Sequence, residues 1–211
     1  MVIKCKNVYK KFDKNEIISN CNLEIEAGEF VCIYGKSGSG KTTLLNMIGS
    51  LEDVSEGSIE FLKDGKVYNT IQHKKFIRKN LVNFIFQNFA LIQMKTVKYN
   101  LLFSMQELKL SKTEKLKLIN QELTRVGLVD KIDSYIYELS GGEQQKVAIL
   151  RALLKPCEII LADEPTGSLD EDNRQMVVEF FKEINDEGKT IIVVSHDKIF
   201  KSHASRIIEL K

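Results

Sequence analysis

The sequence predicts an α/β protein with a mainly parallel sheet, and three observations support this fold class. Apolar runs of strand length occur at residues 30–34, 158–162, 190–195 and 206–210. Between the second and third of these runs, residues 173–185 carry apolar side chains at helical spacing. Strands that alternate with helices along a chain form parallel sheets. The length of 211 residues suits one domain with a substantial core.

The first third of the chain predicts an antiparallel β subdomain beside the strand at residues 30–34. Residues 23–26 alternate between apolar and charged side chains, as a half-buried strand does. Strand-like residues 57–61 and 67–68 flank Asp64-Gly65, a dipeptide that favours a two-residue hairpin turn. We therefore expect an antiparallel flap in this part of the chain.

The middle of the chain, about residues 88–154, is predicted to be mostly helical. Ser111 and Glu114 have the spacing of a capping box, which marks the first turn of a helix. Apolar residues follow at helical spacing at Leu116, Ile119, Leu123 and Val126. The remaining segments, about 1–87 and 155–211, then form the α/β core with its β flap.

Composition excludes several classes of protein. A hydrophobic content of 43% with only two prolines excludes a disordered chain. No apolar run approaches the roughly 18 residues of a membrane helix, and the first residues lack the apolar core of a secretory signal. A net charge of +2 is too small to indicate nucleic-acid binding. We expect a soluble intracellular protein whose cysteines are reduced thiols, namely Cys5, Cys21, Cys32 and Cys157.

A phosphate-binding loop is the first functional motif. Residues 35–42 read GKSGSGKT and fit the pattern G-x-x-x-x-G-K-[ST] between a strand and the start of a helix. Glycines let successive backbone N–H groups face one anion, and the helix N-terminus adds a partial positive charge. Lys41 can reach the β- and γ-phosphates, and the Thr42 hydroxyl can bind Mg²⁺. The residues expected to bind nucleotide are Gly35, Lys36, Ser37, Gly38, Ser39, Gly40, Lys41, Thr42 and Thr43.

A strand that ends in two carboxylates is the second motif. Asp163 and Glu164 follow the apolar residues 159–162. Asp163 would hold Mg²⁺ opposite Thr42, and Glu164 would act as the general base that polarises the attacking water. Kinases, GTPases and ATPases share these two motifs. The sequence has neither an N-K-x-D-like guanine-binding motif nor an arginine cluster typical of a small-molecule kinase lid.

The sequence LSGGEQQ at residues 139–145 is the most specific signal. Ser140 and Glu143 form a second capping box, and two glycines between them leave the helix N-terminus open to an anion. With this motif the chain resembles the ATP-binding cassette (ABC) ATPases, whose signature is LSGGQ, and the resemblance covers nearly its whole length. It implies a P-loop NTPase with a RecA-like core, an antiparallel β subdomain and an inserted α-helical subdomain.

The resemblance also assigns roles to individual residues. Gln87 resembles the Q-loop glutamine, which binds Mg²⁺ and water and senses the membrane partner. His196 resembles the switch histidine that contacts the γ-phosphate. Ser168-Leu169-Asp170 resembles the D-loop, which communicates across a dimer.

An aromatic residue near the N-terminus stacks on adenine in this family. Phe12 is the best placed and Tyr9 is the alternative, although a typical member has tyrosine at this position. Two departures in and near the signature, Glu143 for the commoner Gln and Lys146 where Arg is frequent, are expected to affect only the rate.

The resemblance further implies a head-to-tail homodimer that closes on ATP. Each nucleotide then lies between one phosphate loop and the signature of the other subunit, so Ser140, Gly141 and Gly142 would touch the ATP held by the partner's Lys41. The chain carries one copy of each motif and would need a second copy to complete a site. The expected cofactors are ATP and Mg²⁺.

The finer match is to ATPases of lipoprotein-release and of macrolide- or peptide-export systems, through residues 83–92, 161–170 and the short C-terminal end after residues 207–210. It implies an integral membrane permease with a large extracytoplasmic domain, a location on the inner face of the cell membrane, and no nucleic acid. Two alternatives remain open, namely a gating partner in cell division and a cassette ATPase that acts on nucleic acid. Apolar residues within 87–102 are a hypothetical surface for the permease, namely Phe89, Leu91, Ile92, Val97, Tyr99 and Leu101.

Overall fold

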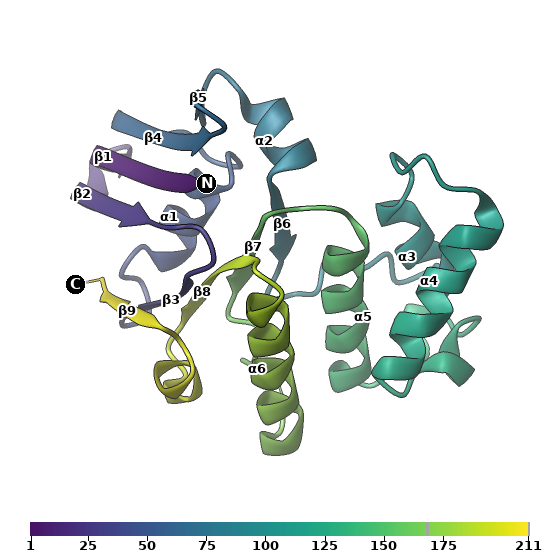
Figure 1. Cartoon of the computed structure of the whole chain (residues 1–211). Helices are drawn as coiled ribbons and strands as arrows, with labels where there is room; N and C mark the ends of the chain where they lie inside the picture. Colours follow the sequence, from purple (N-terminus) through teal and green to yellow (C-terminus); the bar gives the residue numbers. More distant parts are fainter. Residues whose placement is uncertain (168, 211) are drawn as a thin grey trace.

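The computed structural model describes residues 1–167 and 169–210 and contains two β-sheets (Figure 1). The larger sheet is parallel, with the order β6-β7-β8-β3-β9. Its strands are β3 (Phe30–Tyr34), β6 (Val82–Ile85), β7 (Ile159–Asp163), β8 (Thr190–Ser195) and β9 (Arg206–Glu209). The predicted α/β class with a parallel sheet is therefore confirmed.

The smaller sheet is antiparallel and has the order β2-β1-β4-β5. Its strands are β1 (Val2–Phe12), β2 (Asn15–Ile25), β4 (Glu56–Lys63) and β5 (Lys66–Asn69). The predicted hairpin is present, because Asp64 and Gly65 join β4 to β5 with φ angles of +50° and +72°. Both angles suit a mirror-image turn, which matches the twist of antiparallel strands.

Helices cover the parallel sheet and extend away from it (Figure 1). Three of them follow β6 and precede β7, in the segment predicted to be helical, and both predicted capping boxes are formed at Ser111 and Ser140. The helices are α1 (Lys41–Ile48), α2 (Lys74–Asn80), α3 (Val97–Ser104), α4 (Lys112–Arg125), α5 (Gly141–Leu154) and α6 (Glu171–Asp186). Short 3₁₀ turns are η1 (Val129–Lys131), η2 (Ile136–Glu138) and η3 (Lys198–Ser202).

Two hydrophobic clusters lie on opposite faces of the parallel sheet. Along β8, Ile191 and Val193 pack into the cluster of α3 to α6, whereas Ile192 and Val194 pack into the cluster of α1 and the smaller sheet. This alternation follows from the two-residue period of a strand. Because both faces are covered, β8 is fully buried, and polar chemistry is confined to the carboxyl-terminal edge of the sheet.

The structure corrects the sequence interpretation in two places. The strands β1 and β6 were not predicted as separate elements, because β6 has only four residues and β1 interleaves four lysines with its apolar positions. Of the six apolar residues proposed as a partner surface, Leu91, Val97 and Leu101 are buried core residues. No helix within the described residues is long and apolar enough to cross a membrane.

Candidate active site

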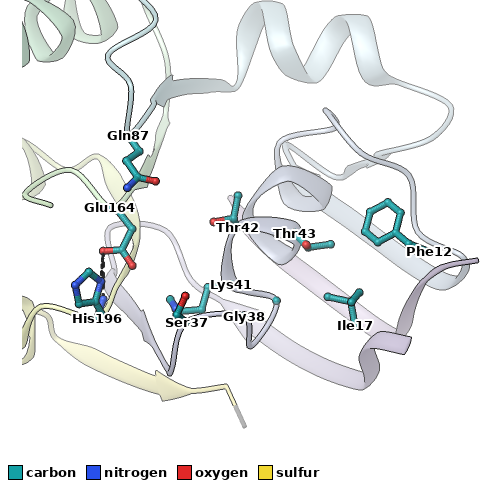
Figure 2. Close-up of a pocket in the computed structure, with 11 residues that line it drawn as sticks. Phe12, Ile17, Ser37, Gly38, Lys41, Thr42, Thr43, Gln87, Glu164 and His196 are labelled. Atoms are coloured by element: carbon teal, nitrogen blue, oxygen red, sulfur yellow. Dashed lines mark hydrogen bonds and ion pairs between the residues drawn. The ribbon is translucent and has the colours of Figure 1, made fainter. Parts of the chain in front are cut away.

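A cavity of about 650 Å³ lies between the carboxyl-terminal ends of the parallel strands and the β1–β2 hairpin (Figure 2). The parallel sheet supplies the polar side of this cavity, and the hairpin supplies an apolar side. The residues that line it are Phe12, Ile17, Ser37, Gly38, Gly40, Lys41, Thr42, Thr43, Gln87, Glu164 and His196. The structure thus brings together most of the predicted nucleotide-binding and catalytic residues from five separate segments.

The loop between β3 and α1 has the geometry of an anion-binding loop. Gly38 and Gly40 adopt left-handed backbone angles, with φ of +81° and +86°, which other residues rarely adopt. Gly40 is the N-cap of α1 and provides no side-chain cap, so the first N–H groups of the helix face the cavity. The buried Lys41 Nζ donates to the carbonyl oxygens of Gly35 at 3.0 Å and Lys36 at 2.9 Å.

Three residues of this loop do not face the main cavity. Gly35, Lys36 and Ser39 line a separate cavity of about 420 Å³ beside the end of β9. A Cβ atom at Gly35 would lie 2.6 Å from the Leu210 carbonyl oxygen, so the loop and the C-terminal strand are in close contact.

A candidate metal site lies where α1 meets β7. The Thr42 hydroxyl donates to Asp163 Oδ1 at 2.9 Å, although the two residues are 121 positions apart. Burial raises the pKa of the Asp163 carboxyl, and the hydrogen bond from Thr42 works in the opposite direction. A hydroxyl and a carboxylate at this distance, with the Gln87 amide also lining the cavity, are hard oxygen donors of the kind that Mg²⁺ prefers.

Glu164 is held in an unusual backbone conformation at the end of β7. Its φ angle is +43°, and its N–H donates to the Val194 carbonyl oxygen at 2.9 Å. The carboxylate oxygen Oε2 lies 2.9 Å from His196 Nδ1 and accepts hydrogen bonds from Ser195 Oγ at 3.0 Å and from the His196 N–H at 3.3 Å. The Glu164 side chain is only 12% exposed, whereas the His196 side chain is 68% exposed. Figure 2 shows both side chains on the polar side of the cavity.

The apolar side of the cavity distinguishes between the two aromatic candidates. Phe12 lines the cavity and is 45% exposed, and Lys10 Nζ lies 4.6 Å from its ring centroid. Tyr9 is not among the lining residues, and its backbone accepts a hydrogen bond from the Ser55 N–H. Ile17, which the sequence analysis missed, lines the cavity from β2 (Figure 2). The tight turn that pairs Phe12 with Asn15 brings Ile17 to this side, and the sequence offered no other signal for it.

The signature residues Ser140, Gly141 and Gly142 do not line this cavity. Ser140 caps α5, and a Cβ atom at Gly142 would lie 2.9 Å from the Asn173 side chain. Asn173 in turn donates through its backbone to the side chain of Asp170, the N-cap of α6. The predicted signature and D-loop segments are therefore next to each other and apart from the phosphate loop. Ser168, also assigned to the D-loop, lies outside the described residues.

The comparison with known families is consistent with this fold and geometry. The sequence profile of the family described as "ABC transporter" matches residues 18–167. The chain belongs to the ABC transporter family, and it is an ATP-binding cassette ATPase.

Individual relatives cover this chain almost completely. The macrolide export ATP-binding/permease protein MacB of Campylobacter jejuni is 40% identical over 98% of the chain, but the chain spans only 32% of that protein. An uncharacterized ABC transporter ATP-binding protein of Methanocaldococcus jannaschii, MJ1508, is 40% identical over the whole chain and 96% of its own length. A dimeric post-hydrolysis structure of the cassette MJ0796 bound to ADP and Pi has a TM-score of 0.88 at 37% identity, covering 99% of this chain and 94% of that one.

Proposed function

We propose that this ATPase hydrolyses MgATP as a head-to-tail homodimer and drives a membrane permease that exports or extracts a peptide, lipoprotein or antimicrobial compound. The observation that carries the proposal is the separation of two half-sites within one chain. The phosphate loop and Glu164 line one cavity, whereas Gly141 lies at the exposed start of α5 outside it. The dimeric cassette structures of similar sequence support the pairing of two such chains.

The phosphates are bound by the loop and by the N-terminus of α1. In the proposed complex, Lys41 Nζ exchanges its two carbonyl partners for oxygens of the β- and γ-phosphates, which gives stronger, charge-assisted bonds. Thr42 and Asp163, with Gln87, hold Mg²⁺, which supplies positive charge at the phosphate oxygens. On the other side, Phe12 stacks on the adenine ring and Ile17 contacts its edge.

Glu164 and His196 carry out the chemical step. The Glu164 carboxylate orients a water molecule toward the γ-phosphate and accepts its proton, as a general base does. His196 reaches into the cavity and donates a hydrogen bond to the γ-phosphate as negative charge develops on it. The signature glycines of the second chain complete the site with the N-terminus of α5.

The permease contact is proposed at a groove beside β6 and α3. The groove has a volume of about 400 Å³ and combines apolar side chains with two basic residues and the acidic Glu107. Phe103, half exposed, lines it from α3, and Arg151 and Lys155 line it from the end of α5. Such a surface suits a short amphipathic helix with acidic residues. The similarity to the MacB proteins, which are named as ATP-binding/permease proteins, supports a membrane permease as the partner. In this proposal the permease has a large extracytoplasmic domain, and the ATPase works at the inner face of the membrane.

The experiment that tests this function is capture of the partner. Tagged Glu164→Gln protein is expressed in its native cell, given MgATP and purified from solubilised membranes, and proteins bound to it are identified by mass spectrometry. We expect a polytopic protein with a large extracytoplasmic domain. Phe103→Asp added to this Glu164→Gln bait should reduce its recovery, whereas Phe103→Asp alone should keep basal ATP hydrolysis. The matched control is Leu118→Asp, an exposed residue of α4 away from the groove. Recovery only from the soluble fraction with nucleic acid would contradict the transport role.

A further inference from the structure

The buried hydroxyl of Ser195 is part of a polar network behind Glu164. Neither the phosphate-binding loop nor the acidic end of β7 explains this network. Ser195 is the last residue of β8 and has no exposed surface. Its Oγ donates to Glu164 Oε2 at 3.0 Å and accepts a hydrogen bond from the Asp197 N–H at 3.0 Å. A serine hydroxyl has a single proton, and the backbone N–H occupies an acceptor position on Oγ. The proton is therefore directed at the carboxylate.

The geometry at Glu164 shows what this hydroxyl achieves. Among the described residues, both hydrogen bonds to the Glu164 carboxylate end on Oε2, from Ser195 Oγ and from the His196 N–H, and His196 Nδ1 lies 2.9 Å from the same oxygen. The second oxygen, Oε1, is left for a water molecule in the cavity. His196 is largely exposed and is expected to turn toward the nucleotide, whereas Ser195 is fixed within the sheet. Ser195 is thus the side-chain contact that stays in place when the His196 ring turns away.

The far side of Ser195 is anchored as well. Asp197 caps η3 by accepting from the Ile199 N–H at 3.1 Å, and its other oxygen accepts from Thr166 Oγ at 3.1 Å. Thr166 is fully buried in the loop that follows Glu164. Each of these groups has a defined partner, so the hydroxyl of Ser195 has little freedom to rotate.

We propose that Ser195 is a positioning residue for ATP hydrolysis, which orients the ionised carboxylate of Glu164 so that Oε1 faces the attacking water. It does not touch the nucleotide. The proposal rests on the proposed role of Glu164 as the general base. A hydrogen bond that orients the base acts on the chemical step and leaves ground-state binding of ATP unchanged, so it affects kcat and not KM.

Steady-state ATP hydrolysis by the purified chain tests this proposal. Ser195→Ala should lower kcat by about tenfold to a hundredfold, with an unchanged KM for ATP. The variants Ser195→Thr and Ser195→Val have side chains of nearly the same shape and differ in the hydroxyl. We expect the Thr variant to keep most of the kcat and the Val variant to lose it. A matched control is Thr190→Val, which removes a buried hydroxyl at the other end of β8 and should leave kcat unchanged.

A double variant separates failure of this proposal from failure of the proposed base. In a Glu164→Gln background, Ser195→Ala should cause no further loss of kcat, because the hydroxyl acts through the carboxylate. Equal kcat values for Ser195→Thr and Ser195→Val, or wild-type kcat in Ser195→Ala, together with a strongly reduced but measurable kcat in Glu164→Gln, would overturn the positioning role alone. Normal turnover in Glu164→Gln would overturn the assignment of the base itself. If Ser195→Ala fails to fold, the comparison of Ser195→Thr with Ser195→Val still tests the positioning role.

Discussion

Thr42 Oγ1 and Asp163 Oδ1 are joined by a 2.9 Å hydrogen bond that connects the start of α1 to the end of β7. The bond brings the phosphate-binding loop and the acidic end of β7 together at one point of the sheet edge. The same placement buries the Asp163 carboxyl and raises its pKa. The ionised Asp163 carboxylate, which is suited to bind a metal ion, therefore lowers the free energy of unfolding when no ion is bound.

This relationship predicts a pH-dependent gain in stability for Asp163→Asn in the absence of nucleotide and Mg²⁺. Because the folded-state pKa is raised, the folded chain binds the proton more tightly than the unfolded chain. The wild-type stability therefore falls as pH rises from the unfolded pKa through the raised folded value, and the full penalty is present above the folded-state pKa. Asparagine has no charge to bury and still accepts from Thr42.

Urea denaturation at several pH values measures this effect. Asp163→Asn should have the higher free energy of unfolding at pH 7, and its advantage should vanish in acid below the unfolded pKa. A constant difference at all pH values would contradict a charge effect. The variant should also lose Mg²⁺-dependent hydrolysis.

Phe12 is predicted to contribute to ATP affinity through stacking. Phe12→Ala should raise the Kd for ATP by about tenfold, because loss of one base–aromatic contact costs about 1–3 kcal/mol. Phe12→Tyr should keep the affinity. Isothermal titration calorimetry gives both values, with Tyr9→Ala as the control that should bind ATP normally. A larger loss of affinity in Tyr9→Ala than in Phe12→Ala would reverse the assignment.

Gly49 is predicted to be required for packing at the end of α1. A Cβ atom at this position would lie 1.9 Å from the Phe84 ring and 2.9 Å from Leu161 Cδ1. Gly49→Ala should therefore lower the free energy of unfolding by about 1–3 kcal/mol, as overpacking does in cores. Thermal or urea denaturation checks this, and an unchanged midpoint would mean that the ring has room to move.

Gly141 is predicted to matter only in the dimer. Within one chain, a Cβ atom at Gly141 would have no atom within 4 Å, and alanine is the better helix former. Gly141→Ala should therefore keep monomer stability and Kd for ATP, and lose turnover at high protein concentration. Full turnover in Gly141→Ala would show that the partner's nucleotide does not approach this position.

The sequence predicted the site best where chemistry demands particular residue types. The phosphate loop, Asp163 and Glu164 stand out because few other residues can bind phosphates, metal ions and water in those places. The sequence was a poorer guide to the partner surface, because tertiary packing decides which apolar residues are buried. Nothing in the pattern of Leu91, Val97 and Leu101 distinguishes a partner surface from core, and the structure buries all three.

Two residues of the site depend on tertiary structure in a different way. Ile17 reaches the cavity only because the β1–β2 hairpin folds beside the phosphate loop. Ser195 contacts Glu164 only because β7 and β8 are neighbours, since the two residues are 31 positions apart in the sequence. Neither residue belongs to a local motif that states its role, so sequence spacing alone does not reveal them.

We propose that one chain carries two half-sites and that two chains complete them around ATP. The most direct measurement is the molar mass of Glu164→Gln protein with MgATP, by size-exclusion chromatography with light scattering, together with the amount of bound nucleotide. We predict a dimer with one ATP per chain, and a monomer when Gly141→Ala is added. A monomer that binds ATP tightly in Glu164→Gln would contradict the claim.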